Sequence, residues 1–123
     1  MFEVTVGGWF AAAHQLRLDD GTLEPLHGHN WLVRVTFRGE RIGPSGMLVD
    51  FTQLRPRLDA VLRAMHDRNL NELPPFANRN PSAEFVAVHI AEALSAADWA
   101  GARLACVEVE EAPGCVARYL PVV

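Results

Sequence analysis

The sequence predicts an α+β fold in which two helices cover one face of an antiparallel four-stranded sheet. Apolar and polar residues alternate in the first and last parts of the chain, whereas apolar residues recur at helical spacing between them. The elements therefore follow the order ββααββ. At 123 residues the chain is long enough for one domain with a single core, so residues 1–123 are expected to pack together.

The first two strands have the clearest alternation. Residues Phe2 to His14 form one pattern, interrupted at Gly7-Gly8, where we expect a bulge. Residues His27 to Arg38 alternate without interruption, which places His27 and His29 on the same face of their strand.

The remaining elements are predicted from capping and turn residues. One helix should begin between Asp50 and Gln53, and a second at Asn80-Pro81, where a capping residue precedes a proline. The segments Arg103 to Glu111 and Val116 to Val122 should form a hairpin around Pro113-Gly114.

The composition of the chain indicates which kinds of partner the protein is expected to bind. A net charge of −4 argues against nucleic acid, because a surface that binds a phosphate backbone is basic. No apolar segment reaches the roughly 18 residues needed to span a bilayer, so we expect no membrane partner and a cytoplasmic protein. A small phosphorylated ligand would need only a few arginines, for which Arg17, Arg34 and Arg68 are candidates.

Three histidines end apolar strand faces. His27 and His29, two residues apart on one strand, could bind one ion, and pairing of the first two strands could bring His14 beside them. Three imidazoles with an open fourth position are typical of a catalytic zinc site. On these residues alone, a metal site and three histidines that merely pack or face solvent are comparable alternatives.

Six motifs in order resemble the 6-pyruvoyltetrahydropterin synthase / 6-carboxytetrahydropterin synthase family over nearly the whole chain. They are Phe10 to His14, His27 to Trp31, Gly46 to Phe51, Asn69 to Asn71, Asn80 to Glu84, and Val107 to Glu111.

The resemblance implies a tunnelling fold (T-fold), in which sheets of several subunits join into a barrel with pterin sites between subunits. It further implies Zn²⁺ bound by His14, His27 and His29, and a homo-oligomer, expected to be a hexamer of two trimers. Glu111 matches the carboxylate that binds the guanidine-like edge of the pterin, and Ser82 matches a hydroxyl lining the pterin pocket. Ser82 could equally be a simple helix-start residue.

Glu24 marks a departure from the family pattern. The pyruvoyl and carboxy enzymes carry a cysteine base shortly before the His-Gly-His block, where this chain has Gly21 and Leu23. Glu24, three residues before His27, resembles a subgroup in which glutamate replaces that cysteine and the product is 6-hydroxymethyl-7,8-dihydropterin. The alternative is that Glu24 is a solvated loop residue.

His66 and Asp67 form the second departure. The family usually has Asp-His before the Asn-Leu stretch, as a pair assisting proton transfer, and here the order is reversed. Exchanging neighbours at a helix end turns each side chain by about 100°. Either the local register slips by one, so that His66 still reaches the site with Asp67 or another carboxylate orienting it, or the pair is simply a helix C-terminus.

These features together predict a zinc-dependent lyase acting on 7,8-dihydroneopterin triphosphate. Its catalytic candidates are Glu24, His66 and Asp67, and Glu111 and Ser82 are its candidate substrate contacts. The alternatives are a 6-pyruvoyl or 6-carboxy synthase, a pterin-binding homologue with impaired chemistry, and a structural oligomer held together by a closed four-ligand metal site.

Overall fold

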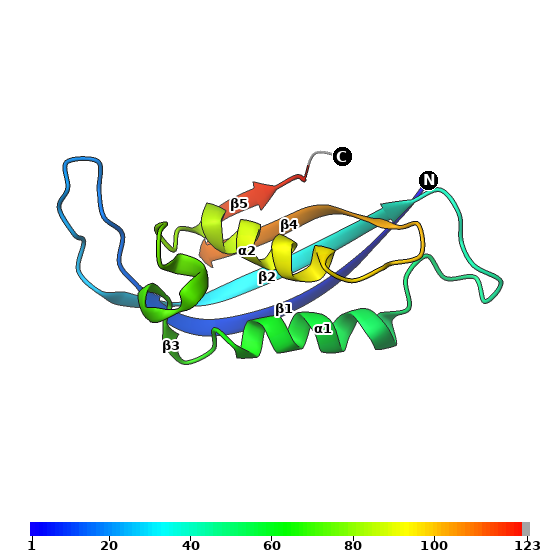
Figure 1. The fold of residues 1–123 in the computed structure, drawn as a ribbon, viewed down its shortest axis with the longest axis horizontal. Coiled ribbons are helices and arrows are strands. Elements are labelled where there is room, and N and C mark those ends of the chain that lie inside the picture. Colours follow the sequence, from blue (N-terminus) through cyan, green and yellow to red (C-terminus); the bar gives the residue numbers. More distant parts are fainter. Residues whose placement is uncertain (122–123) are drawn as a thin grey trace.

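A five-stranded sheet carries two helices in the computed structural model, which describes residues 1–121 (Figure 1). The sheet has the order β3-β1-β2-β4-β5. The strands are β1 (Phe2–His14), β2 (His27–Gly39), β3 (Arg68–Asn69), β4 (Arg103–Ala112) and β5 (Cys115–Tyr119). The helices are α1 (Phe51–Arg63) and α2 (Ala83–Ser95), and two 3₁₀ turns, η1 (Leu70–Glu72) and η2 (Pro74–Phe76), connect β3 to α2.

The four long strands and two helices follow the predicted ββααββ order, but the four-stranded, wholly antiparallel sheet is wrong in detail. β3 adds a fifth strand, which pairs in parallel with the free edge of β1. Because β3 has only two residues, its sequence is too short to show alternation.

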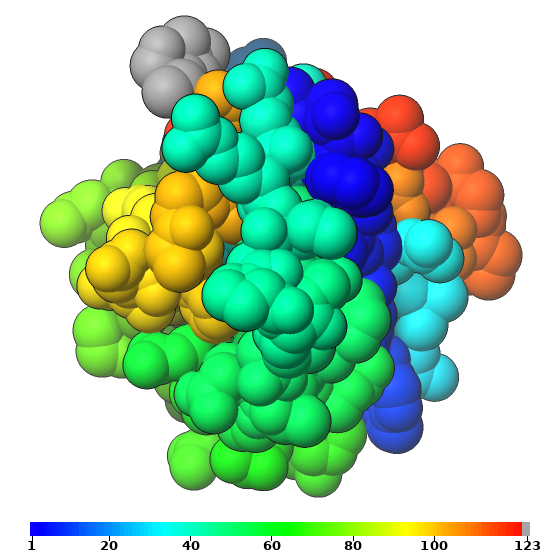
Figure 2. Space-filling view, turned by 90° about the vertical axis from the view of Figure 1, so that its right-hand side faces the viewer, coloured from blue at the N-terminus to red at the C-terminus, as the bar shows by residue number. Residues whose placement is uncertain are grey.

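Both helices lie on one face of the sheet, as expected. The inward side chains of the long strands are almost fully buried, among them Phe10, Trp31, Val35 and Val107. Figure 2, an end view, shows the strands on one side and the helical segments on the other. No helix in residues 1–121 is both long and apolar enough to cross a membrane.

The predicted bulge at Gly7-Gly8 is wrong. β1 pairs with β2 without interruption from Phe2 to His14, so the even-numbered residues share one face throughout. Gly8 faces α1, where an added Cβ would lie 2.7 Å from Leu62 Cδ1. Gly8 therefore allows α1 to approach the sheet closely. The alternation of apolar and polar residues is interrupted here because glycine has no side chain, and not because a residue is inserted.

The predicted element ends are partly confirmed. Asp50 caps α1, whose first residue lies in the predicted range. α2 begins at Ala83 with Ser82 as its cap, and not at Asn80-Pro81. The hairpin turn is confirmed, although β5 ends at Tyr119 and Val122 lies outside the described residues.

We expect Gly8→Ala to lower the free energy of unfolding by about 1 kcal/mol, because the new methyl group must displace the buried side chain of Leu62. Gly7→Ala is the matched control, since its Cβ would come no closer than 3.4 Å to another atom. Urea denaturation of both variants measures the difference, and equal stabilities would contradict the close-packing role of Gly8.

Candidate metal centre

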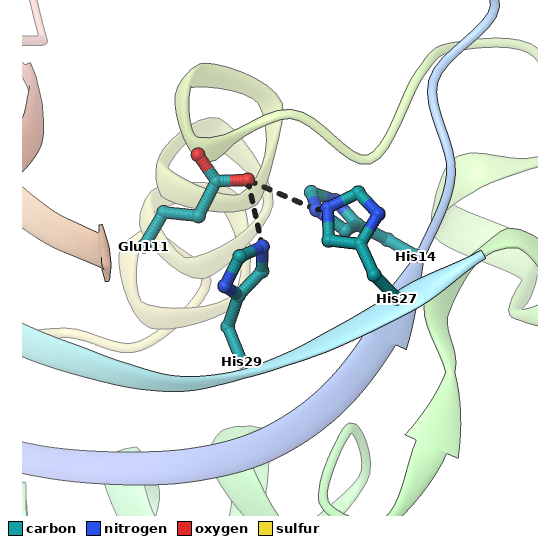
Figure 3. A group of neighbouring side chains, drawn as sticks. All are labelled: His14, His27, His29 and Glu111. Carbon is teal, nitrogen blue, oxygen red and sulfur yellow. Dashed lines mark hydrogen bonds and ion pairs between the residues drawn. The ribbon is translucent and has the colours of Figure 1, made fainter. Parts of the chain in front are cut away.

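Three imidazoles converge at one end of the β1–β2 pair. His14 and His27 are opposite each other at the last position of the pairing, and Ala12 pairs with His29, so all three side chains share the inner face. His14 Nε2 lies 3.1 Å from His27 Nε2. Figure 3 shows the rings turned toward a common point. The sequence prediction that these histidines meet is therefore supported by the register of the two strands.

Two of the rings are oriented by main-chain carbonyl groups. His14 Nδ1 lies 2.7 Å from the oxygen of Pro81, and His27 Nδ1 lies 2.7 Å from that of Pro25. Because a carbonyl oxygen can only accept, each Nδ1 carries a hydrogen, which leaves Nε2 as the ring nitrogen available to a metal ion. This is the arrangement in which a metal-binding histidine is fixed by a second hydrogen bond.

His29 Nε2 is a buried nitrogen that forms no hydrogen bond with the described residues. Burial lowers the pKa of His29, against the opposing effect of the Glu111 carboxylate, and this favours the neutral ring that a metal ion can bind. A buried polar atom without a partner costs free energy. A metal ion bound at His29 Nε2 would remove that cost.

Glu111 supplies a fourth donor to the cluster. Its Oε1 lies 2.9 Å from His14 Nε2 and 3.5 Å from His29 Nε2. Glu111 ends the inner face of β4, which it shares with the buried Val107 and Val109, as alternation along a strand requires. The structure thus places a carboxylate beside the fourth position that the sequence had suggested would be open.

The four donor atoms are close enough to bind one ion, since they all lie within 4.8 Å of one another. Three imidazole nitrogens and one carboxylate oxygen form a donor set that suits zinc and other divalent first-row metals. The residues therefore fit the metal that the sequence predicted, whether Glu111 binds the ion or leaves that position for a substrate.

Glu24 lies next to this cluster. Its Oε1 is 3.9 Å from His27 Nε2 and accepts a hydrogen bond of 3.0 Å from the Leu16 backbone N–H. The side chain is about one-quarter exposed, between solvent and the imidazoles. The structure therefore brings Glu24 to the site, and the loop from residue 17 to residue 23 is exposed around it.

His66 and Asp67 lie elsewhere in the chain. His66 Nδ1 accepts a hydrogen bond from the Ala11 backbone N–H, at the edge of β1 where β3 begins. The His66 ring packs edge-on against Trp9, whose side chain is on the outer face of the sheet. No contact joins either residue to the three histidines within residues 1–121. In one chain the structure does not bring this pair to the metal cluster.

Asp67 has a left-handed backbone with φ of 58°, and its N–H donates to the Ala11 oxygen. α1 has already ended at Arg63, and residues 64–67 form a turn. Reversal of the family order therefore falls on a turn and not on a regular helical surface. The turn is the C-terminus of α1, because the His66 N–H donates to the Leu62 oxygen at 3.0 Å and Asp67 has the left-handed backbone that often follows a helix. In addition, both residues bond to the β1 edge.

The other predicted contacts have identified partners. The Ser82 hydroxyl accepts from the Phe85 N–H, so its helix-start role is confirmed. Arg17 donates to the Gly21 oxygen, and Arg34 lies in register with Glu108 on the outer face. Arg68 lines a cavity of about 580 Å³ together with Asp67 and residues 28–30.

Sequence reasoning missed four residues that shape the site. They are Pro25 and Pro81, through their carbonyl oxygens, and Asn71 and Asn80, through their side-chain amides. Asn80-Pro81 was read as a helix start, because the pattern of a cap followed by proline is the usual signal for one. Backbone carbonyl groups that accept hydrogen bonds leave no signal in the sequence, since every residue carries one.

Comparison with known proteins identifies the family to which this chain is similar. The family model described as 6-pyruvoyl tetrahydropterin synthase matches residues 3–121. A dihydroneopterin monophosphate aldolase of Pyrococcus furiosus is 33% identical over 85 residues, covering 69% of this chain and 68% of that protein. A 6-carboxy-5,6,7,8-tetrahydropterin synthase of Synechocystis sp. is 34% identical over 115 residues, covering 89% and 86%.

Solved structures show the same fold. The 6-pyruvoyl tetrahydropterin synthase of Caenorhabditis elegans superposes with a TM-score of 0.85 at 26% identity, over 98% of this chain and 96% of that one. A variant of the Plasmodium vivax 6-pyruvoyltetrahydropterin synthase, in which a catalytic glutamate is replaced by cysteine, gives a TM-score of 0.82 at 20% identity. That match covers 99% and 98% of the two chains.

We expect His29→Ala to lower zinc affinity by at least about tenfold, because one of three imidazole ligands is lost. His89→Ala is the control, since His89 packs against Phe76 and is not part of the cluster. Competition with a chromogenic chelator measures both. Equal zinc affinity of the His29→Ala variant and the wild type would contradict the metal centre.

At Asp67, we expect the Ala variant to be less stable than the Gly variant by about 1 kcal/mol, because φ of 58° is unfavourable for a residue with a Cβ. Asp67→Asn should retain near-wild-type stability, since asparagine also tolerates this conformation. Thermal and urea unfolding measure the relative stabilities of the three variants. An Ala variant as stable as the Gly variant would contradict the described turn.

Proposed function

Because this chain belongs to the 6-pyruvoyl tetrahydropterin synthase family, we propose that it is a zinc-dependent pterin lyase that cleaves 7,8-dihydroneopterin triphosphate by a retro-aldol reaction. The products are 6-hydroxymethyl-7,8-dihydropterin and glycolaldehyde carrying the triphosphate. The observation that carries this proposal is the position of the Glu24 carboxylate, 3.9 Å from His27 Nε2 at the edge of the metal cluster.

The metal would be held by His14, His27 and His29. When bound, the ion supplies Lewis acidity, which lowers the pKa of a substrate hydroxyl and makes its proton easier to remove. Two of the three imidazoles are already fixed by carbonyl groups in the geometry this requires.

Glu24 acts as the base in this reaction. It takes the proton of the hydroxyl on the second side-chain carbon, and the electron pair forms the new carbonyl of the aldehyde product. The bond between the first and second side-chain carbons breaks, and its electrons pass into the dihydropterin ring. A proton returned to the first carbon completes the hydroxymethyl group, so the reaction needs no oxidant or reductant.

Glu111 and Ser82 are proposed to contact the pterin ring. The Glu111 carboxylate accepts paired hydrogen bonds from the guanidine-like edge of the pterin, and its place at the end of a buried face favours a bidentate donor. Ser82 Oγ accepts from the Phe85 N–H, and its own O–H remains a donor for the ring.

His66 and Asp67 are proposed to handle the returning proton from a neighbouring subunit. Within one chain they contact the edge of β1 and not the cluster. The family resemblance implies pterin sites between subunits of a homo-oligomer, expected to be a hexamer of two trimers, in which such a pair could face another chain's metal.

Cleavage of dihydroneopterin monophosphate is the second candidate. It is favoured by the Pyrococcus furiosus relative, whose name states an aldolase for the monophosphate. The chemistry at the ring and side chain is the same, and the two candidates differ only in the phosphate chain. A 6-pyruvoyl or 6-carboxy synthase is less well supported, because no cysteine lies within or just before the loop that carries Glu24.

The proposal is tested by incubating zinc-loaded protein with each dihydroneopterin phosphate and identifying the pterin by liquid chromatography and mass spectrometry. We expect 6-hydroxymethyl-7,8-dihydropterin, with the triphosphate preferred. Faster conversion of the monophosphate would establish the second candidate, and absence of any new pterin would refute both.

We expect Glu24→Gln to lower kcat by about 10²- to 10⁴-fold, because the amide cannot take the hydroxyl proton. Zinc content should be unchanged, since three imidazoles still bind the ion. Glu3→Gln is a surface control, as Glu3 pairs with Arg38 at the far end of the sheet. Full activity of the Glu24→Gln variant would exclude Glu24 as the base of the reaction.

We expect Glu111→Gln to raise KM for the pterin by about tenfold or more, because a charged bidentate acceptor is lost. Zinc should remain near one ion per chain. Loss of zinc in this variant would instead identify Glu111 as the fourth ligand, and would favour the closed structural site over the lyase.

A further inference from the structure

Residues 15–17 continue β1 as an extended segment, and side chains occupy both of its edges. On one edge, the Asn71 side chain accepts from Gln15 N–H at 2.9 Å and donates to the Gln15 oxygen at 2.8 Å. On the same edge, Asn80 accepts from Arg17 N–H and donates to the Arg17 oxygen, both at 2.9 Å.

Each asparagine thus replaces a strand partner. A primary amide has an acceptor and a donor side by side, so it can bond both polar groups of one extended residue, as a neighbouring peptide would. In an extended chain, alternate residues direct N–H and C=O to opposite edges. Gln15 and Arg17 therefore face the two asparagines, and Leu16 faces the other way.

Glu24 occupies the opposite edge. Its backbone N–H donates to the Leu16 oxygen at 2.9 Å, and its Oε1 accepts from the Leu16 N–H at 3.0 Å. The carboxylate is therefore placed relative to His27 through the position of Leu16. Leu16 in turn lies between two residues whose main chain is held by Asn71 and Asn80.

The loop is closed by its own hydrogen bonds, but these do not attach it to the rest of the protein. Residues 17–23 are exposed and project from the end of the sheet (Figure 1), with a bridge between Arg17 and Leu23 and hydrogen bonds that join Leu18 to Thr22 and Gly21. The two asparagines come from elsewhere in the sequence, Asn71 from η1 and Asn80 from the turn before α2. They connect the loop to the helical layer.

We propose that Asn71 and Asn80 are positioning residues that hold the Glu24 carboxylate beside the metal cluster. This inference rests on the proposed function for its catalytic consequence, but the positioning itself concerns only this chain's own residues. It also gives the Asn80-Pro81 dipeptide two tasks, because the Pro81 oxygen orients His14.

Hydrogen exchange tests the positioning without reference to activity. In the zinc-loaded Asn71→Ala and Asn80→Ala proteins, the amides of Leu16 and Glu24 should exchange about tenfold faster or more, although neither amide touches an asparagine. The amide of Val33, in the middle of the sheet, serves as an internal reference, and Asn78→Ala, an exposed neighbour, is the control variant.

A purely local role for the asparagines predicts a different pattern. Only the amides of Gln15 and Arg17 would then exchange faster, while those of Leu16 and Glu24 would keep wild-type rates. That result would overturn the proposal. If the alanine variants fail to fold, Asn71→Asp serves in their place, because it keeps the acceptor for Gln15 N–H and turns only the donor into an acceptor.

A double-mutant cycle tests the catalytic consequence. We expect Asn71→Ala to lower kcat by about 10- to 100-fold in the otherwise wild-type protein, with KM little changed, because a displaced base impairs the reaction more than substrate binding. In the Glu24→Gln background the same change should have no further effect. Equal losses in both backgrounds would show that Asn71 does not act through Glu24.

The two measurements separate the inference from the proposed function. Faster exchange at Leu16 and Glu24 in a protein that cleaves no pterin would retain the positioning role and refute the lyase. Wild-type exchange in an active enzyme would retain the lyase and refute the positioning role.

Discussion

The site depends on two hydrogen bonds from imidazole Nδ1 atoms to the carbonyl oxygens of Pro25 and Pro81. They direct the Nε2 atoms of His14 and His27 toward the cluster, and the burial of the His14 ring against Trp31 restricts that ring further. Both acceptors belong to prolines, whose ring fixes φ. The carbonyl positions are therefore more restricted than those of ordinary loop residues, and they orient the ligands before any ion binds.

The same region also explains why α2 begins later than its sequence suggests. Asn80 would be a good cap for a helix starting at Pro81, but its amide bonds to the main chain of Arg17. Ser82 caps the helix instead, two residues further on. The cost of delaying a helix by two residues is small, whereas the extended turn frees the Pro81 oxygen to orient His14.

Alternation predicted the parts of the site that lie on strands. The shared face of His14, His27 and His29, and the inner position of Glu111, follow from a period of two once the strands are identified. The bulge at Gly8 was predicted wrongly because the same alternation cannot distinguish a missing side chain from an extra residue. The β3 strand and the carbonyl and amide contacts escaped prediction, because each depends on a partner more than ten residues away or on a main-chain atom.

His66 and Asp67 lie apart from the three histidines in a single chain. His66 packs on Trp9, which is 57% exposed on the outer face of the sheet, whereas His14 is buried on the inner face. The two groups are therefore directed to opposite sides of β1. A reaction that uses both must take the pair from one copy and the histidine cluster from another. In the homo-oligomer proposed above, the effect of the reversed His-Asp order would depend on which groups of the neighbouring copy the left-handed turn at Asp67 contacts.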